Sequence, residues 1–195
     1  MTGPPHDIFP YVAEFCRSIA ATSTPRFLDL SAAAGDLPVE CVGNVRRRIA
    51  GLGWKIWEWY GVMIEAEFHM VWRSPDGMLH DVTPHTITLN RVVFLPDASL
   101  IYEEKQVNNI RHALISSPRV EEFIAIAHQI FTIQNKGERA TQFLITLSED
   151  EARTLQALEL KKAQLAVLIE NTPPGRNELC RCGSGRKTKR CCGKA

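Results

Sequence analysis

The sequence predicts an α+β protein in which helices pack on an antiparallel sheet of four or five strands. Apolar residues alternate with mostly polar ones over residues 62–72, which is the period of a strand with two different faces. The tetrad Ser74-Pro75-Asp76-Gly77 supplies a turn, and residues 78–83 return as the second strand of a hairpin. Segments whose apolar residues recur with the period of a helix precede and follow this hairpin in the sequence.

The turn also predicts the register of the hairpin. A type I turn matches the twist of the strands only when a left-handed residue follows it as a bulge, and Gly77 can take that conformation. With the bulge, Ser74 faces Met78, and His69 and Asp81 become diagonal neighbours on one face, with backbones about 7–8 Å apart. A plain two-residue turn would put Asp81 on the other face. We expect the bulge.

The remaining elements follow from periodicity and caps. Residues 7–20 predict a helix, and a second helix begins near Asp36 with Val42, Val45, Ile49 and Leu52 as its stripe. A clearer helix opens at Ser117-Pro118, and the capping box of Ser148 and Glu151 starts a helix that runs to about residue 170. We expect further strands at residues 26–30, 86–95 and 142–147, and weak helix over residues 101–115.

Length and composition limit the class of protein. A chain of 195 residues with 45% apolar and 23% charged residues fits one domain of ordinary size with a small appendage. No apolar run approaches the roughly 18 residues that a membrane span needs. The first ten residues lack the basic and apolar regions of a secretory signal. We therefore expect a cytoplasmic protein without a membrane segment, in a reducing compartment.

The net charge of +1 conceals an asymmetry. Residues 176–195 carry seven Lys/Arg and one Glu, a sum of +6, which leaves −5 for the rest of the chain. An acidic body argues against a nucleic-acid stacking platform built from Trp54, Trp57 and Trp59. We expect these rings to form core and cleft wall, and no nucleic-acid partner other than a ribosomal one.

Four of the six cysteines lie in the last 16 residues, as Cys180, Cys182, Cys191 and Cys192. A tail of 20 residues is too short for a hydrophobic core, so a metal or a disulfide must hold it if it folds. In a reducing compartment, four thiolates favour one structural Zn²⁺ per chain, with a disulfide-bonded or disordered tail as the alternative. The Pro/Gly stretch at residues 171–175 separates a body (1–170) from this zinc knuckle (176–195).

The tail resembles the SEC-C motif, which is named from the C-terminus of the preprotein-translocase ATPase and is appended to many unrelated bacterial proteins. Arg181 and Thr188 stand where that family usually has a proline and an aromatic residue. The resemblance implies a module that recruits a protein partner such as a chaperone or the ribosome. The matching residues are Pro174-Gly175-Arg176-Asn177, Cys180-x-Cys182-Gly183-Ser184-Gly185, Lys187 and Cys191-Cys192-Gly193.

The body carries a candidate catalytic set in the order Cys41, His69, Asp81. The first turn of a helix favours a thiolate at Cys41, and the hairpin brings an imidazole toward a carboxylate. This order, with Asp76-Gly77 between the two strands, is similar to the transglutaminase-like and papain-like core. The resemblance implies a cysteine nucleophile for acyl transfer or amide hydrolysis by an amidase, peptidase or transglutaminase.

Two functions remain open from the sequence. Either the body is a cysteine enzyme recruited by its tail, or it is a non-catalytic adaptor in which Cys41 is a structural cysteine and His69 only packs. Glu65 and Glu67 share the face of His69. They would either select cationic substrates or mark a face that is merely solvated.

Overall fold

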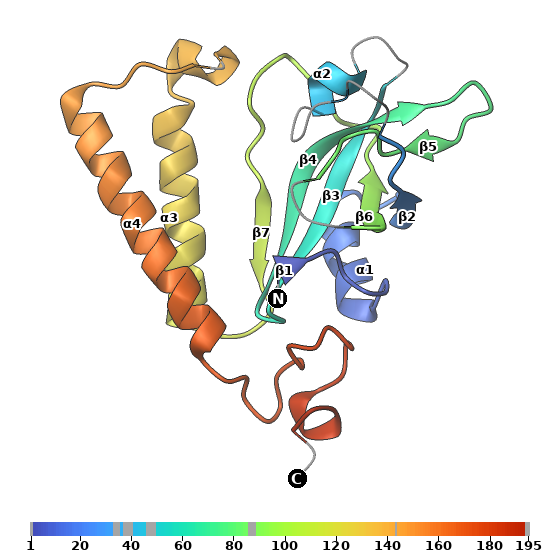
Figure 1. Ribbon diagram of the computed structural model, residues 1–195, viewed down its shortest axis with the longest axis vertical. Coiled ribbons are helices and arrows are strands. Elements are labelled where there is room, and N and C mark those ends of the chain that lie inside the picture. The colour runs from blue at the N-terminus through green and yellow to red at the C-terminus, as the bar shows by residue number, and fades with distance from the viewer. Residues whose placement is uncertain are drawn as a thin grey trace. The chain divides into compact units, whose positions relative to one another are not determined.

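The computed structural model describes residues 2–32, 36, 41–45, 50–85, 89–142 and 144–193. The chain divides into two compact units. The sheet unit comprises Thr2–Trp59 and Ile64–Leu100, and the helical unit contains Tyr60–Met63 and Ile101–Ala195. Figure 1 shows a curved sheet in the first unit and long helices in the second. Among the described residues, none of the helices combines the length and apolar character needed to cross a membrane.

The sheet unit is built on antiparallel strands in the order β2-β6-β3-β4-β5. A short strand β1 (Thr2–Gly3) pairs with β3, and helix α1 (Pro10–Ile19) confirms the first predicted helix. The α+β prediction with an antiparallel sheet is therefore confirmed, but the described residues form seven paired strands in place of the four or five expected. The main strands are β2 (Arg26–Asp29), β3 (Ala50–Trp59), β4 (Met63–Arg73), β5 (Leu79–His80) and β6 (Arg91–Pro96).

The two ends of this strand order meet, so the sheet is nearly a closed barrel. Leu30, just after β2, forms a parallel bridge with Asp81, just after β5. The Ser31 N–H also donates to the Asp81 carbonyl at 2.7 Å. A buried apolar cluster fills the space that the strands enclose, because closure places one face of every strand inside. Its members are Leu28, Val71, Val92 and Phe94, with Leu30, Leu79 and Leu89 against them.

The predicted hairpin register is confirmed. Trp72 pairs with His80 and Arg73 with Leu79, which continues to Ser74 facing Met78. The Ser74 N–H donates to the Met78 carbonyl at 2.9 Å. Gly77 has φ +84°, the left-handed conformation that the bulge requires.

Of the two alternatives for the face of β4 that carries Glu65, Glu67 and His69, a merely solvated face does not fit Glu65 and His69, although the Glu67 side chain is 39% exposed. Glu65 and His69 are only 6% and 2% exposed, and Val71 beside them is fully buried. A strand with period-two alternation has two chemically different faces, but the curled sheet buries both of them. Glu65 and His69 therefore lie out of solvent, where each side chain needs a hydrogen-bond partner.

Three other sequence expectations are corrected. Leu52 lies in strand β3, not on the stripe of a helix, because the aromatic-rich segment after it favours a strand. Residues 101–115 contain strand β7 (Ile110–Ala113) and no helix. Residues 142 and 144–147 form no strand. The second predicted helix is described only as α2 (Cys41–Val45), and residues 37–40, 46–49 and 86–88 lie outside the described residues.

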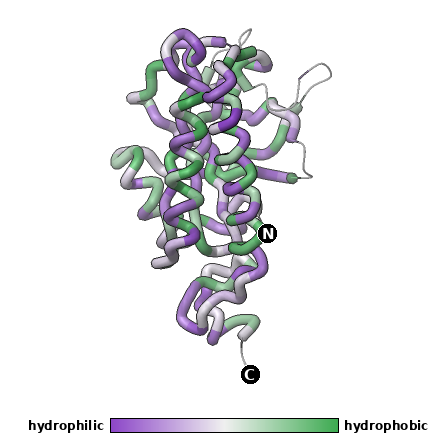
Figure 2. The backbone as a smooth tube through the Cα atoms, turned by 90° about the vertical axis from the view of Figure 1, so that its left-hand side faces the viewer, coloured by the Kyte–Doolittle hydropathy of each residue, from purple (hydrophilic) through white to green (hydrophobic). Residues whose placement is uncertain are grey.

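The helical unit is organised by α3 (Pro118–Gln134) and α4 (Glu149–Asn171), which pack on each other. The predicted capping box at α4 is confirmed, since the Glu151 N–H donates to Ser148 Oγ at 3.2 Å and the Ser148 N–H donates to Glu151 Oε2 at 3.1 Å. Figure 2 shows hydrophobic and hydrophilic residues interspersed along both helices, as expected for helices that bury one face. Short 3-10 helices η1 (Gly137–Thr141) and η2 (Thr188–Arg190) complete the unit.

Replacing Gly77 tests the bulge. A Cβ at Gly77 would meet nothing within 4 Å, so Gly77→Ala changes only the backbone preference. We expect Gly77→Ala to lower the free energy of unfolding by about 1 kcal/mol, because the left-handed conformation is strained for alanine. Gly77→Asn should lower it less, since asparagine visits that conformation readily. Equal losses for the two variants in denaturant titrations would contradict the bulge.

Candidate functional site

The hairpin brings His69 and Asp81 together. The His69 Nε2–H donates to Asp81 Oδ1 at 2.9 Å, and the side chains are 3% and 0% exposed. The same carboxylate oxygen accepts the Thr83 N–H at 3.0 Å. The edge of the His69 ring also meets the Phe94 ring, with centroids 6.4 Å apart. The imidazole is thus held by one charged hydrogen bond and by the apolar core around it.

Cys41 completes the set from helix α2. Its thiol is half-buried and hydrogen-bonded to the His69 ring, and the Met70 backbone also hydrogen-bonds to it. Because Nε2 of His69 faces Asp81, the nitrogen left for the thiol is Nδ1. The structure therefore places Cys41, His69 and Asp81 in one hydrogen-bonded series.

The electrostatics favour an ion pair between thiolate and imidazolium. Burial by itself raises the pKa of the Cys41 thiol, but the hydrogen bond and charge of His69, helped by the Lys55 ammonium, lower it overall. Burial lowers the pKa of His69, but the hydrogen bonds to Asp81 and Cys41 raise it overall. Burial raises the pKa of Asp81, yet its imidazole partners hold it well below its usual range. Asp81 therefore stays a carboxylate beside His69.

Cys16 provides the contrast. It lies fully buried on α1, and burial raises its pKa to about 12. No other cause acts on this thiol, so it stays protonated at neutral pH. Cys16 is the small buried hydrophobe that free cysteines commonly are.

Polar contacts also join side chains of β3 to the glutamates of β4. Lys55 is buried and pairs with Glu67 at 2.9 Å, and its ammonium lies 4.9 Å from the centre of the Trp57 ring. The Trp57 indole N–H donates to Glu67 at 2.7 Å, while the Trp59 indole N–H donates to Glu65 at 2.9 Å. The tryptophans thus donate to one buried carboxylate, Glu65, and to the partly exposed carboxylate of Glu67, whose charge Lys55 offsets.

His85 is a site residue that the sequence did not reveal. Its Nε2 lies 3.2 Å from Asp81 Oδ2, and its side chain is 7% exposed. The residue follows Pro84 in a segment without regular structure, so no periodicity points to it. Only the closed sheet shows that it shares a carboxylate with His69.

The four cysteines of the tail form the candidate metal centre. One sulfur each from Cys180, Cys182, Cys191 and Cys192 all lie within 4.8 Å of one another. The Sγ atoms of Cys182 and Cys191 are 3.3 Å apart, and those of Cys191 and Cys192 are 4.0 Å apart. Tetrahedral zinc with bonds of about 2.3 Å needs sulfurs about 3.8 Å apart, so the cluster matches that size.

The backbone of the tail wraps this cluster. Leu179 bridges to Lys187, and the Cys180 N–H donates to the Arg186 carbonyl at 2.8 Å. Gly183 and Gly185 both have positive φ, as the tight loop requires. A Cβ at Gly193 would lie 2.8 Å from Thr188 Cγ2 and 3.0 Å from the Thr188 carbonyl oxygen, so this position needs glycine.

Arg181 fixes the knuckle to the end of α4. Its guanidinium donates to the carbonyls of Glu170 and, at 2.6 Å, Ile169, which the helix itself leaves without N–H partners. The same group lies 5.9 Å from the centre of the Tyr60 ring. Arg181, one of the two departures from the SEC-C pattern, thus caps the C-terminus of α4 and contacts Tyr60.

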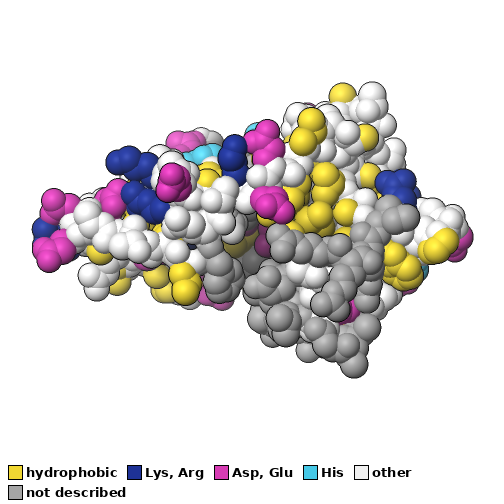
Figure 3. Space-filling view, turned by 90° about the horizontal axis from the view of Figure 1, so that it is seen from above, with side chains coloured by type: hydrophobic (Ala, Val, Ile, Leu, Met, Phe, Trp, Pro, Cys, Tyr) yellow, Lys and Arg dark blue, Asp and Glu magenta, His cyan; other side chains and the backbone are white. Residues whose placement is uncertain are grey.

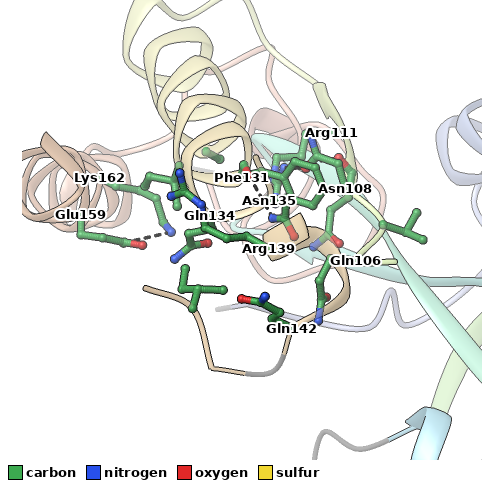
Figure 4. Close-up of a pocket in the computed structure, with 15 residues that line it drawn as sticks. Gln106, Asn108, Arg111, Phe131, Gln134, Asn135, Arg139, Gln142, Glu159 and Lys162 are labelled. Carbon is green, nitrogen blue, oxygen red and sulfur yellow. Dashed lines mark hydrogen bonds and ion pairs between the residues drawn. The ribbon is translucent and has the colours of Figure 1, made fainter. Parts of the chain in front are cut away.

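A polar pocket lies in the helical unit (Figure 4). Its volume is about 500 Å³, and its base is formed by Ala127, Ile130 and Phe131 of α3. Within the part of the chain that the structure describes, the side-chain amides of Gln106, Gln134 and Gln142 at its rim have no hydrogen-bond partner. The charges beside them are compensated, since Arg139 pairs with Glu151 and Lys162 with Glu159.

The helical unit presents no single-sign surface on the face shown in Figure 3. Acidic and basic side chains are interspersed over it in this view. A mixed surface of this kind does not favour nucleic acid over other partners.

Comparison with known proteins gives a partial relationship. The chain is 34% identical over 118 residues to the "Protein translocase subunit SecA" of Pelodictyon phaeoclathratiforme (strain DSM 5477 / BU-1), over 60% of this chain and 9% of that protein. It is 39% identical over 66 residues to the "Protein translocase subunit SecA" of Campylobacter fetus subsp. fetus (strain 82-40), over 32% of this chain and 8% of that protein. The chain thus spans less than a tenth of the length of these relatives.

No protein-family model and no solved structure matches the chain. The partial similarity to SecA and the four-cysteine cluster together fit a SEC-C zinc motif. The transglutaminase-like core finds no support in these comparisons, and the roles of Cys41, His69 and Asp81 stay predictions.

The Asp81→Asn variant tests the electrostatics of the site. We expect it to lose about 3 kcal/mol of stability at pH 7, because it removes one partner of a buried charged pair. The pKa of Asp81 is lower in the folded than in the unfolded state, where it is about 3.9. The stability that Asp81 contributes is therefore fully present above about pH 4 and disappears as the pH falls toward its folded pKa.

Denaturant titrations between pH 3 and pH 7 measure this difference. The exposed pair of Glu103 and Lys105 provides a control, since Glu103→Gln should leave the unfolding midpoint unchanged at every pH. A gap between wild type and Asp81→Asn that stays constant with pH would contradict the assignment.

Proposed function

We propose that this chain is a SEC-C type zinc-binding protein of the cytoplasm whose sheet unit catalyses cysteine acyl transfer or amide hydrolysis. The observation that carries the catalytic part is the hydrogen-bonded series from the Cys41 thiol through His69 to Asp81. Nucleophile, base and orienting carboxylate in contact are what cysteine acyl transfer needs. Burying an imidazole beside a half-buried thiol also costs desolvation free energy that apolar side chains at these positions would not.

Each residue has one role in this chemistry. The Cys41 thiolate attacks the carbonyl carbon of an amide or ester, while Nδ1 of the His69 imidazolium holds the proton. His69 then donates that proton to the departing amine or alcohol, which leaves a thioester on Cys41. Neutral His69 next takes a proton from water or an acceptor amine, whose attack releases the acyl group and restores the thiol. Asp81 keeps the tautomer fixed and stabilises the imidazolium throughout.

In this proposal the tail binds a structural metal ion. Cys180, Cys182, Cys191 and Cys192 would hold one Zn²⁺ as a closed tetrahedral site, with no position open for substrate. Four thiolates on Zn²⁺ carry a charge of about −2, which the surrounding basic residues offset. The ion would order the knuckle and present its basic surface to a protein or ribosomal partner, such as a chaperone.

A second candidate function is a non-catalytic adaptor. The pocket in Figure 4 favours it, because Gln106, Gln134 and Gln142 offer unused amide donors and acceptors around an apolar base. Side-chain amides of this kind match the backbone of a bound peptide. The adaptor would recognise a protein or peptide there and use its zinc tail as a second docking site.

Metal content tests the tail. Freshly purified protein should contain about one zinc per chain by elemental analysis, with zinc–sulfur distances of about 2.3 Å by X-ray absorption. Cys191→Ser should lose most of the metal, because three thiolates hold zinc far less well than four. Cys41→Ser is the matched control and should retain it. Metal-free protein with intact thiols would overturn the zinc assignment.

Reactivity of Cys41 tests the catalytic part. Iodoacetamide should modify Cys41 at least tenfold faster than Cys16 at pH 7, because the thiol pKa is lowered at Cys41 and raised to about 12 at Cys16. His69→Ala should remove most of this advantage while the domain stays folded. Peptide mapping by mass spectrometry locates the modified cysteine.

An activated ester such as p-nitrophenyl acetate then separates the two functions. The enzyme should form a thioester at Cys41 and release one equivalent of nitrophenol in a burst, which Cys41→Ser abolishes. A Cys41 no more reactive than a free thiol, with no burst, would favour the adaptor.

A further inference from the structure

We propose that His85 is a positioning residue of the cysteine site, which holds the second oxygen of Asp81 so that the first stays on His69. This inference rests on the proposed function for its effect on reactivity. The contacts of His85 themselves are independent of that function.

The two oxygens of Asp81 have separate partners. Oδ1 accepts from His69 Nε2 at 2.9 Å and from the Thr83 N–H at 3.0 Å. Oδ2 lies 3.2 Å from His85 Nε2, and no other donor in the described part of the chain reaches it. Since Asp81 is fully buried, His85 is the group that satisfies this oxygen.

A carboxylate held at one oxygen can still rotate about its Cβ–Cγ bond. The broad torsional preference of aspartate at this bond permits such rotation, so contacts must fix it. Donors at both oxygens leave one orientation, in which Oδ1 lies in line with the His69 N–H. Without His85, the buried Oδ2 loses its donor, and the carboxylate gains by turning toward other donors or admitting water.

His85 is itself held in place. Its ring meets the Trp57 ring edge-on, with centroids 6.3 Å apart. Trp57 donates to Glu67, and Glu67 pairs with Lys55. His85 therefore stands at one end of a series of contacts through Trp57, with Asp81 at its Nε2.

The arrangement also fixes which nitrogen of each imidazole carries a proton. An ionised carboxylate only accepts hydrogen bonds, so both His69 and His85 present Nε2–H to Asp81. His69 is left with Nδ1 toward Cys41, as the proposed proton transfers require. The titratable groups next to His85 are Asp81 and His69, with Cys41 beyond His69. Glu67 and Lys55 lie beyond Trp57, which they both contact.

His85→Ala should leave the Asp81 carboxylate, and with it the His69 ring, less firmly oriented, without removing any group that touches the thiol. We expect the rate of Cys41 alkylation at pH 7 to fall about threefold to tenfold, and the inflection of its pH profile to move to higher pH. The reason is that Asp81 loses the hydrogen bond from His85 and then stabilises the protonated His69 ring less well. His85→Gln, which keeps a donor, should recover at least half of that loss. His80→Ala is the matched control, since His80 lies in the same hairpin against Trp72 and should leave the profile unchanged.

Imidazole ¹H–¹⁵N spectra give a readout that does not depend on catalysis. In the wild type, both His69 and His85 should show a protonated Nε2 that exchanges slowly with water. His85→Ala should speed the exchange of the His69 proton by tenfold or more. The wild-type spectrum is informative even if His85→Ala does not fold, since a His85 that lacks a protected Nε2–H would overturn the proposal.

The outcomes separate the two proposals. A lower melting temperature with an unchanged alkylation profile and unchanged His69 exchange would mean that His85 only packs, and the proposal would fail. An unreactive Cys41 in the wild type would overturn the proposed catalysis, while protected protons on both imidazoles would still support the role of His85.

Discussion

One carboxylate, Asp81, joins the architecture of the sheet unit to its chemistry. Through its backbone it closes the sheet, because Leu30 bridges to it and the Ser31 N–H donates to its carbonyl. Its side chain accepts from two imidazoles and one backbone N–H. A buried anion without these donors would be strongly destabilising, and the donors without the anion would lose their orientation. Closure of the sheet and alignment of His69 therefore both depend on Asp81, the first on its backbone and the second on its carboxylate.

The sheet unit buries several charged side chains beside the partly exposed Glu67, and these charges have defined partners. Indole N–H groups of Trp57 and Trp59 satisfy Glu67 and Glu65, and Lys55 offsets the charge of Glu67. A tryptophan is suited to this role because it adds apolar area and one donor. Such a network contributes little net stability compared with an apolar core, since desolvation of the charges offsets their attraction. It does fix the electrostatic field at Cys41, where Lys55 and His69 both favour the thiolate.

What the sequence could predict here was local. The register of the hairpin followed from four turn residues, and with it the meeting of His69 and Asp81. The capping box of Ser148 and Glu151 was equally local. The difference concerns distant pairing: the apolar pattern places Leu52 on a helix, although β3 is paired between β4 and β6. The sequence also leaves open whether the face of His69 is solvated, and the curled sheet buries Glu65 and His69 on it. His85 was missed for the same reason, since its partner is fixed by closure of the sheet and by no sequence spacing.

The order of the tail has a different physical origin from that of the sheet unit, because 20 residues cannot bury enough apolar surface to fold alone. Its order comes from four sulfurs around one point, from glycines that permit the tight loop, and from Arg181 on the last carbonyls of α4. The four cysteines could bind a metal, whereas the Arg181 contact depends only on a helix end whose carbonyls would otherwise lack partners. An arginine at this position therefore gives the knuckle an attachment to its own helix that a proline, which lacks side-chain donors, could not provide. The same contact uses a cation of the tail to cap α4, so the guanidinium of Arg181 is engaged within the chain itself.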